Sequence, residues 1–396
     1  MVIALRLKNF YSLKEYATLD FTADINQRNN KDNLPQNLID FSGEKYVNII
    51  GVFGSNAAGK SNIIRALDFC RNLILYSHLN NVETEFEFST FKFGDNQISE
   101  FYIDFVSGGI EYEYGFTIDN QQIIKEELYY YPKKRKAKIF VREGSTYSYG
   151  KGLITRPGAV EASTGPRTLF LSQATAMNRQ LAQEIYRFFS QKIIIGVGEM
   201  NMSSITPKEF EDYKDVILTA LNVGDSDIVN IRLVTDAEGR NKLYTYHKED
   251  PSIEFDFDTE ESDGTKRLFF ILFRLLKSAF SGATIFLDEF DLKLHLRLSE
   301  FILDFVRATH AAQLVFTSHN AALMSSENLR PEQIVLVNKE SNGNSDFFAV
   351  SDFKGVDSKM DIQKAYLQGR FDAVPYIGSS YNIVEKFIAN SNGKKI

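Results

Sequence analysis

The sequence predicts an α/β fold, and three patterns along the chain support this prediction. An apolar strand at Tyr46–Phe53 runs directly into a glycine-containing loop, which a helical pattern follows. Residues 86–149 alternate polar and apolar positions between turn pairs, which is typical of an antiparallel β meander. From Ser262 onward, a helix, a buried strand, a second helix and another buried strand follow one another, as they do in α/β units.

The composition is that of a folded protein with a sizeable core. The 396 residues are 43% hydrophobic and 24% charged. The net charge of −7 excludes a globally basic nucleic-acid-binding protein but not a local basic groove. Cys70 is the single cysteine, which excludes a disulfide framework. Because no apolar run approaches the roughly 18 residues of a membrane span, we expect a cytoplasmic protein without a membrane partner.

The same patterns predict three consecutive parts of the chain. Residues 1–150 form an N-terminal lobe, in which 2–21 alternate as two strands and the meander follows later. Residues 151–260 form an insertion that mixes helix with strand and is mostly helical, and residues 261–396 form a C-terminal lobe. The helix after the glycine-containing loop has apolar residues at three- to four-residue spacing, namely Ile63, Ile64, Leu67, Cys70, Leu73 and Ile74.

The loop itself matches a phosphate-binding pattern. Residues 54–61 read GSNAAGKS, which fits G-x-x-x-x-G-K-[ST] between a strand and a helix. Small residues let backbone N–H groups surround a phosphate, and the helix N-terminus adds positive potential. Lys60 is expected to reach the β- and γ-phosphates, and the Ser61 hydroxyl to bind Mg²⁺. The sequence therefore predicts a nucleotide site formed by Gly54, Ser55, Asn56, Ala57, Ala58, Gly59, Lys60, Ser61 and Asn62.

Two later strands end in residues suited to phosphate chemistry. The apolar strand Ala283–Leu287 is followed by Asp288 and Glu289. A buried parallel strand delivers its C-terminal residues to the crevice where ligands bind, so Asp288 can hold Mg²⁺. Glu289 is placed to orient or deprotonate the attacking water. The next apolar strand ends just before His319, which predicts a γ-phosphate contact for this histidine.

A third element precedes the helix predicted at Leu268–Phe280. Ser262 and Gly264 lie at the N-terminus of this helix, which suits an anion but is equally typical of a simple helix cap. The residues alone leave both interpretations open.

The order of these motifs resembles the ABC-type ATPase heads of the RecF, SMC and OLD-like group, which are P-loop NTPases. Within this group the chain is similar to the AAA-family ATP-binding proteins of bacterial abortive-infection and phage-defence operons, the AbiL/RloA-like and PARIS AriA-like proteins. The resemblance covers most of the chain and rests on the segments Leu7–Phe10, GSNAAGKSN, TLFLSQATAMN, ESDGTKRLF, FLDEFDLKLH, FTSHN and YLQGRFDAVPYI.

The resemblance implies ATP as the ligand and a dimer or larger homo-oligomer. Ser262 and Gly264 would belong to a signature motif that acts in trans, so that two copies meet head to tail around two ATP molecules. Asp291 would lie at the dimer seam, and His319 would be the switch histidine. The signature reads SDGTK and not the LSGGQ of transporters, which argues against a transporter subunit. Gln97 lies in the region of the Q-loop glutamine, although no pattern fixes that assignment.

The leading hypothesis is an ATPase that oligomerises and controls a separately encoded, nuclease-like toxic effector in anti-phage defence. After the ATPase motifs are assigned, no second catalytic pattern remains in the sequence. One alternative is a RecF/SMC-like DNA-maintenance ATPase that clamps DNA. The other is a non-hydrolysing, nucleotide-dependent scaffold or sensor, against which Glu289 argues because a scaffold needs no catalytic base.

Two weaker patterns have two interpretations each. The run Tyr129–Lys136 places basic residues beside aromatic ones and is interpreted as a solvated hairpin tip, or as a contact for nucleic acid or an acidic partner. Asp256 and Asp258 form a D-x-D pair like those of nuclease metal sites. Their place in the alternating segment 253–258 favours a half-exposed strand instead.

Overall fold

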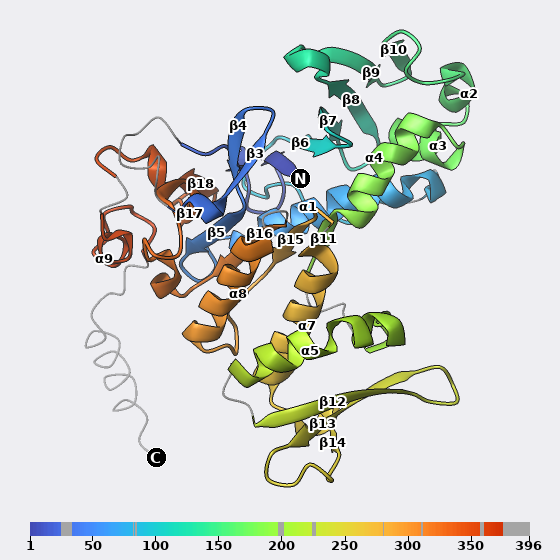
Figure 1. Cartoon of the computed structure of the whole chain (residues 1–396). Coiled ribbons are helices and arrows are strands. Elements are labelled where there is room, and N and C mark those ends of the chain that lie inside the picture. Colours follow the sequence, from blue (N-terminus) through green and yellow to red (C-terminus); the bar gives the residue numbers. More distant parts are fainter. Residues whose placement is uncertain are drawn as a thin grey trace, which may run out of the picture.

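Two large β-sheets organise the protein, one antiparallel and one mostly parallel. In the computed structural model they lie one above the other, with helices between them and beneath them (Figure 1). The structure describes residues 1–24, 34–81, 83, 85–196, 202–223, 227–279, 281–309, 312–356 and 360–374.

The antiparallel sheet confirms the predicted meander and extends it. Its seven strands have the spatial order β10-β9-β8-β7-β6-β1-β2, so the N-terminal hairpin continues the sheet through the pairing of β1 with β6. Buried and partly exposed residues alternate along most of β6, as expected for a sheet with one covered face. The strands are β1 (Val2–Lys8), β2 (Ala17–Asp20), β6 (Ser99–Ser107), β7 (Ile110–Ile118), β8 (Ile123–Tyr130), β9 (Ala137–Glu143) and β10 (Thr146–Tyr149).

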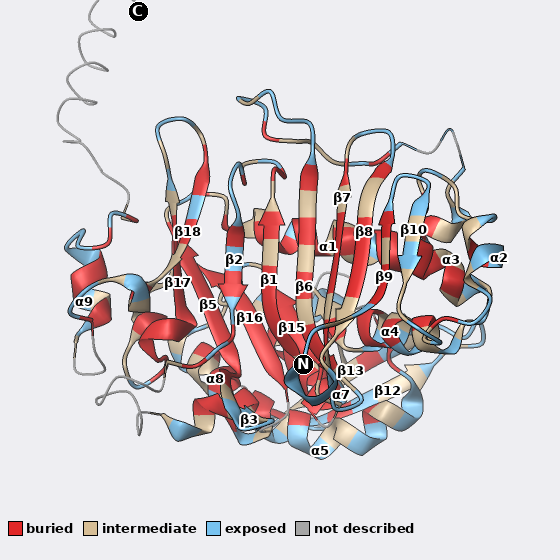
Figure 2. Ribbon diagram, turned by 90° about the horizontal axis from the view of Figure 1, so that it is seen from above, coloured by how far each residue is buried: buried red, intermediate tan, exposed pale blue. Residues whose placement is uncertain are grey.

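The second sheet, here called the P-loop sheet, has the order β11-β15-β16-β5-β17-β18. All of its strand pairs are parallel except the last. Its central strands are buried along their whole length (Figure 2), because both faces of the sheet are covered. The strands are β5 (Ile49–Gly54), β11 (Ile193–Ile195), β15 (Thr284–Leu287), β16 (Gln313–Ser318), β17 (Ile334–Lys339) and β18 (Ser345–Ala349).

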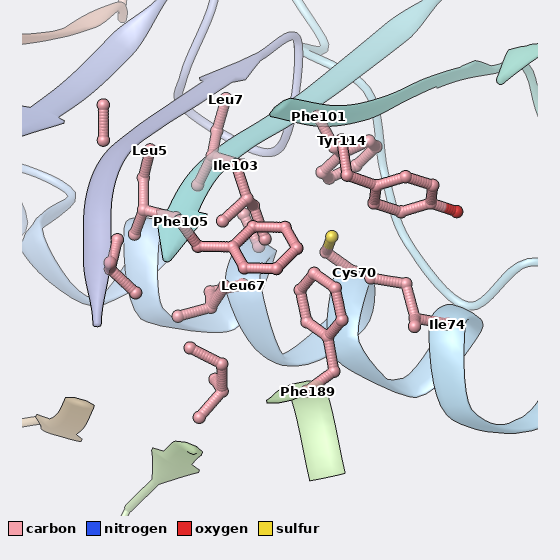
Figure 3. Close-up of a cluster of buried hydrophobic side chains, with 14 of the residues drawn as sticks. Leu5, Leu7, Leu67, Cys70, Ile74, Phe101, Ile103, Phe105, Tyr114 and Phe189 are labelled. Atoms are coloured by element: carbon pink, nitrogen blue, oxygen red, sulfur yellow. The ribbon is translucent and has the colours of Figure 1, made fainter. Parts of the chain in front are cut away.

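The helix after the phosphate-binding loop, α1 (Lys60–Tyr76), lies between the two sheets (Figure 1). Its predicted apolar positions are all buried. Leu67, Cys70 and Ile74 pack there beside Phe105 and Tyr114 of the antiparallel sheet (Figure 3). Burial raises the pKa of the Cys70 thiol, which is core as its helical position predicted. This packing fixes the start of α1, and with it the loop, against both sheets.

The other face of the P-loop sheet packs on a second core. Alternate residues of the same strands contribute to it, for example Phe53 of β5 and Phe316 of β16. The helices that cover this face in Figure 1 are α7 (Asp263–Ala279) and α8 (Leu296–Thr309), and α5 (Pro207–Val223) packs on α7 from below. The peripheral elements are β3 (Leu38–Phe41), β4 (Glu44–Val47), α6 (Phe257–Glu260) and α9 (Ile362–Leu367).

Residues 151–260, predicted as a helical and mixed insertion, contain both helices and strands. The first part forms helices that join the core of the antiparallel sheet. The three isoleucines of β11 then pair with β15, because β-branched residues suit a strand at this sheet edge. The last part joins the second core. The elements are α2 (Pro157–Glu161), α3 (Phe170–Ala176), α4 (Gln180–Gln191), β11, α5, β12 (Ile228–Thr235), β13 (Asn241–His247) and β14 (Phe255–Asp256).

The D-x-D pair caps a helix. Asp256 accepts hydrogen bonds from the backbone N–H groups of Asp258 and Thr259 at the start of α6, so the strand predicted at 253–258 is wrong beyond the short β14. In the described part of the chain, no group of three His, Cys, Asp or Glu side chains is arranged to hold a metal ion. A carboxylate directly before the first residue of a helix is a common N-cap, which explains the pattern.

The basic run lies at the β8–β9 connection, as a hairpin tip would. Lys136 pairs with Glu113 at 2.8 Å and stands over the ring of Tyr129, and Lys134 lies 3.8 Å from Glu44. None of the helices in the described residues is long and apolar enough to cross a membrane.

Candidate nucleotide-binding site

The phosphate-binding loop lies at the carboxyl end of β5 and leads into α1. Ala57 and Gly59 adopt left-handed conformations, with φ angles of 62° and 103°. A Cβ atom on Gly59 would lie 2.1 Å from the Ser345 Oγ atom and 2.5 Å from the Ser12 Oγ atom. Only glycine fits this position, for reasons of both conformation and space.

Three polar side chains hold the loop from outside. Asn62 Nδ2 donates a hydrogen bond of 2.6 Å to Ser12 Oγ, and Ser345 Oγ donates one of 2.5 Å to the Ala58 carbonyl oxygen. Asn62, predicted to bind the nucleotide, therefore ties α1 to the turn after β1. Sequence reasoning did not find Ser12 or Ser345, because they come from distant segments and belong to no motif.

Lys60 lies at the centre of the loop, with 5% of its surface exposed. Its ammonium group donates to the carbonyl oxygens of Gly54 and Ser55, both at 3.0 Å, and lies 3.0 Å from His319 Nε2. Burial lowers the pKa of Lys60 to about 8. The negative charges of Asp288, Glu289 and Asp291 act in the opposite direction but do not cancel this shift. Burial, followed by the charge of Lys60, lowers the pKa of His319, so its ring is neutral at pH 7.

Ser61 and Asp288 meet as the sequence predicted. The Ser61 hydroxyl donates a hydrogen bond of 2.9 Å to Asp288 Oδ1, although the two residues are 227 positions apart in the sequence. Thr317 Oγ1 donates to the same carboxylate oxygen at 2.5 Å and accepts from the Glu289 backbone N–H at 2.8 Å. A serine hydroxyl and a carboxylate side by side are hard oxygen ligands, so these residues fit Mg²⁺. Thr317 was missed because a threonine within a buried strand carries no motif.

Glu289 occupies a tight turn beyond β15. Its φ angle is 47°, and its exposed side chain lines a cavity of about 470 Å³ together with Lys60, Ser61, Thr317 and His319. From α7, the Arg267 guanidinium donates to the backbone carbonyls of Asp288, Glu289 and Phe290. The residues that sequence analysis did not assign to this cavity are Ser12, Arg65, Thr317 and Lys339.

Ser262 and Gly264 lie outside the cavity of their own chain. Ser262 caps α7, since its Oγ accepts a 3.1 Å hydrogen bond from the Thr265 N–H, and its side chain is exposed. Gly264 packs against the Lys293 carbonyl, where an added Cβ would come within 2.8 Å. Asp263 pairs with Lys293 at 2.7 Å and so fixes the start of α7 on the loop beyond Asp291.

Gln97 does not line the cavity. It is exposed, precedes β6 and contacts Thr90 at 3.5 Å. In a parallel sheet the carboxyl ends of neighbouring strands line the site. The neighbour of β15 on the side away from β16 is β11. The residues after β11, 197–201, lie outside the described residues, as do residues 375–377 of the tail segment.

The family comparison decides the class of the protein. The model of the family described as "AAA domain, putative AbiEii toxin, Type IV TA system" matches residues 49–168 and 177–325. The chain belongs to this AAA-domain family. The matched ranges contain the phosphate-binding loop, Ser262, Asp288, Glu289 and His319, so the resemblance to AAA-family ATPases is confirmed at the level of the family. Membership in this AAA-domain family implies nucleotide binding.

Solved structures similar to this AAA-domain protein include heads of SMC proteins. The "SMC head domain from Thermotoga maritima" is 13% identical with a TM-score of 0.44, and the match covers 88% of this chain and 98% of that one. The Pyrococcus furiosus Smc head with an extended coiled coil, bound to the C-terminal domain of ScpA, is 12% identical with a TM-score of 0.44, covering 93% and 98%. The comparison with curated proteins finds no match.

Proposed function

We propose that the protein binds ATP with Mg²⁺ in this cavity and hydrolyses it to ADP and phosphate. The observation that carries the proposal is the convergence of four groups, two from the carboxyl end of β15 and two from that of β16, on the loop that holds Lys60. The Ser61 hydroxyl meets Asp288, Thr317 ties Asp288 to the turn of Glu289, and His319 lies against Lys60.

Each residue has a definite part in the proposed reaction. The backbone N–H groups of residues 54–62 and the Lys60 ammonium bind the phosphates. Ser61 and Asp288 would hold Mg²⁺, which supplies positive charge to the phosphate oxygens. Glu289 orients and deprotonates the attacking water, and His319 contacts the γ-phosphate. Asp288 is kept in place by Thr317, which leaves Glu289 free to reach the water.

We infer that two copies complete each other's sites. Ser262 and Gly264 start α7 outside their own cavity, and a helix N-terminus with exposed polar groups suits a phosphate. In the proposed assembly these residues cover the ATP bound by the partner copy, with Asp291 at the seam between them. ATP then closes the oligomer and hydrolysis opens it, as a ligand that shifts an equilibrium between assembly states.

The proposed biological role is control of a separately encoded toxic effector in anti-phage defence, in the cytoplasm. Its support is the likeness to phage-defence ATPases in the motifs and the family description, which names a toxin and a type IV toxin–antitoxin system. The effector would be nuclease-like, held or released according to the nucleotide state.

Replacing Glu289 with Gln tests the enzymatic proposal. We expect Glu289→Gln to bind ATP as the wild type does, to lose at least about 100-fold in turnover, and to accumulate the closed oligomer in light scattering. Glu327→Gln, an exposed carboxylate away from the cavity, is the matched control. A Glu289→Gln protein that matches the wild type in turnover and in ATP-dependent assembly would support the scaffold alternative.

Affinity purification from the native host tests the biological role. The tagged Glu289→Gln protein, with ATP and with its genomic neighbours intact, should retain a stoichiometric neighbour-encoded protein. Recovery of DNA alone, lost as salt rises, would contradict effector control and support the DNA-maintenance alternative.

A further inference from the structure

The nucleotide cavity has two sides, which correspond to the two neighbours of β5 in the P-loop sheet. On one side lie β16 and then β15, and His319 and Glu289 follow their carboxyl ends. On the other side β17 pairs with β5 in parallel, with Val337 opposite Gly54 (Figure 2). Lys339 is the last residue of β17, two positions beyond Val337, and it lines the cavity. Lys339 therefore reaches the loop from the side opposite to the proposed catalytic groups.

The charge of Lys339 is not balanced by a neighbouring carboxylate. Its side chain forms no ion pair or hydrogen bond with a residue that the structure describes. Partial burial alone lowers the pKa of Lys339, whereas nearby carboxylates oppose the corresponding shift at Lys60. The adjacent Glu340 is engaged elsewhere, because its carboxylate accepts hydrogen bonds from the side chains of Asn342 and Asn344. An ammonium group without an acidic partner adds positive potential to the cavity.

The charges that line the cavity suit a polyphosphate. Lys60, Arg65 and Lys339 are cations, and Glu289 is the single carboxylate among the described lining residues. Because burial lowers the pKa of His319, that ring adds no charge at pH 7. Three cations against one carboxylate leave an excess of two positive charges in the lining, although the whole chain has a net charge of −7. Arg65 lies on α1, so Lys339 is the cation that the β17 side contributes.

The order of the strands indicates which phosphate Lys339 meets. In the proposed reaction Glu289 and His319 act at the γ-phosphate, so this phosphate lies toward β15 and β16. Lys60 binds the β- and γ-phosphates from the loop between the two sides. A triphosphate that lies across the loop therefore places its α-phosphate toward β17. The lysine side chain is a flexible four-carbon stem that can carry its charge to an oxygen of that phosphate.

We propose that Lys339 binds the α-phosphate of the nucleotide, by a hydrogen bond from its ammonium group to one non-bridging oxygen. The inference rests on the proposed function, because it takes the γ-phosphate to lie beside Glu289 and His319. The α-phosphate is present in ATP before hydrolysis and in ADP after it. Lys339 is therefore a binding residue that strengthens the binding of both nucleotides and does not act on the bond that breaks.

Isothermal titration calorimetry of the full chain with ADP and ATP, each with Mg²⁺, tests the proposal. All proteins carry Glu289→Gln, so that hydrolysis does not disturb the ATP titrations. We expect Lys339→Ala to weaken ADP and ATP binding by similar factors of at least about fivefold, because a charged hydrogen bond to the shared α-phosphate is lost. Lys208→Ala, which removes an exposed charge on α5, is the matched control.

Two results of these titrations would overturn the proposal. A loss of affinity for ATP but not for ADP would place Lys339 at the γ-phosphate. Unchanged affinity for both nucleotides would show that the ammonium group stays in solvent.

A thiophosphate analogue separates a direct contact from a general effect of charge. In adenosine 5′-O-(1-thiodiphosphate), sulfur replaces one non-bridging oxygen of the α-phosphate, and the two diastereomers differ in which oxygen is replaced. Sulfur is the weaker hydrogen-bond acceptor. A contact to one oxygen therefore predicts that Lys339→Ala changes the ratio of the two dissociation constants by at least about threefold. The ratio should stay at the wild-type value in Lys208→Ala, and an unchanged ratio in Lys339→Ala would disprove the contact.

The inference and the proposed function fail in different ways. A wild-type protein that binds neither ADP nor ATP contradicts both. A wild-type protein that binds both nucleotides, with Lys339→Ala binding them equally well, contradicts the inference alone. Lys339 is exposed at the end of a strand, so Lys339→Ala should have the unfolding midpoint of the wild type. If this variant does not fold, Lys339→Gln removes the same charge and gives the same comparisons.

Discussion

Arg267 connects the start of α7 to the turn that carries Glu289. Its guanidinium reaches the backbone carbonyls of Asp288, Glu289 and Phe290, at 3.2 Å for the first and 3.4 Å for the last. Glu289 itself has a φ angle of 47°, a backbone conformation that residues other than glycine rarely adopt. Arg267 is therefore expected to stabilise the conformation of the catalytic turn without touching the substrate.

Arg267→Ala should lower turnover and spare binding. A hydrogen bond from a charged donor contributes about 1.5–3 kcal/mol, and a left-handed residue costs about 1–2 kcal/mol. Loss of the charged donors of Arg267 therefore removes a stabilisation about as large as the cost of the left-handed conformation of Glu289. If the free-energy preference for the conformation of the turn that positions Glu289 falls by about 1.4–2.8 kcal/mol, the population of this conformation falls about 10- to 100-fold. The kcat should fall by the same factor. The ATP affinity should change by less than about threefold, because Lys60 and Ser61 keep their contacts.

Steady-state ATP hydrolysis and equilibrium binding of a fluorescent nucleotide measure the two effects separately. Lys208→Ala, which removes an exposed charge on α5 away from the turn and from the signature, is the matched control. Arg267→Lys should recover part of the activity. A kcat for Arg267→Ala within twofold of the control would refute the positioning role.

Three further predictions follow from single contacts. Because burial lowers the pKa of Lys60 to about 8, ATP affinity should weaken as pH rises through about 8, by up to tenfold per pH unit. The ATP affinity of Lys60→Arg should not change over this pH range. A wild-type affinity that does not change with pH would contradict the role of the Lys60 charge. Gly59→Ala should destabilise the protein by at least about 2 kcal/mol more than Gly43→Ala. Both residues have positive φ angles, but a Cβ atom added at Gly43 would meet no atom within 4 Å, whereas one added at Gly59 would meet Ser345. Equal unfolding midpoints of the two variants would refute this tight contact with Ser345. His247 lies between Asp227 and Glu261 at 2.8 and 2.9 Å, and although burial lowers its pKa, these hydrogen bonds outweigh burial and raise it. The protonated His247 therefore stabilises the fold at acidic pH, and this contribution is lost as pH rises through the raised pKa. The difference in unfolding midpoint between the wild type and His247→Gln should be larger at about pH 5.5 than at about pH 8.5. The opposite trend would disprove the pairing of His247 with the two carboxylates.

The sequence predicted the parts of the site that short segments specify. The phosphate-binding loop, Asp288 and His319 each follow an apolar strand, and parallel strands bring their carboxyl ends to one edge. The antiparallel meander was predictable for the same reason, because its alternation and turns are local. The hairpin at residues 2–21 was predictable as well, but its addition to the meander depends on the long-range pairing of β1 with β6.

The parts that sequence reasoning missed depend on contacts between distant segments. Ser12 and Ser345 hold the loop although 333 positions separate them. The three residues of β11 gave no signal of a place in the P-loop sheet, since so short an apolar run occurs in many settings. Asp256 shows the opposite error, because a local pattern that resembled a strand is a helix cap.

Mixing two inactive variants tests the central claim of shared sites most directly. Lys60→Ala removes the phosphate-binding lysine and Ser262→Arg blocks the signature, so each homo-oligomer should be inactive. In a mixed dimer one site keeps an intact loop from one copy and an intact signature from the other. An equal mixture should therefore recover about a quarter of the wild-type turnover. A mixture no more active than its components would show that the signature does not act across the interface.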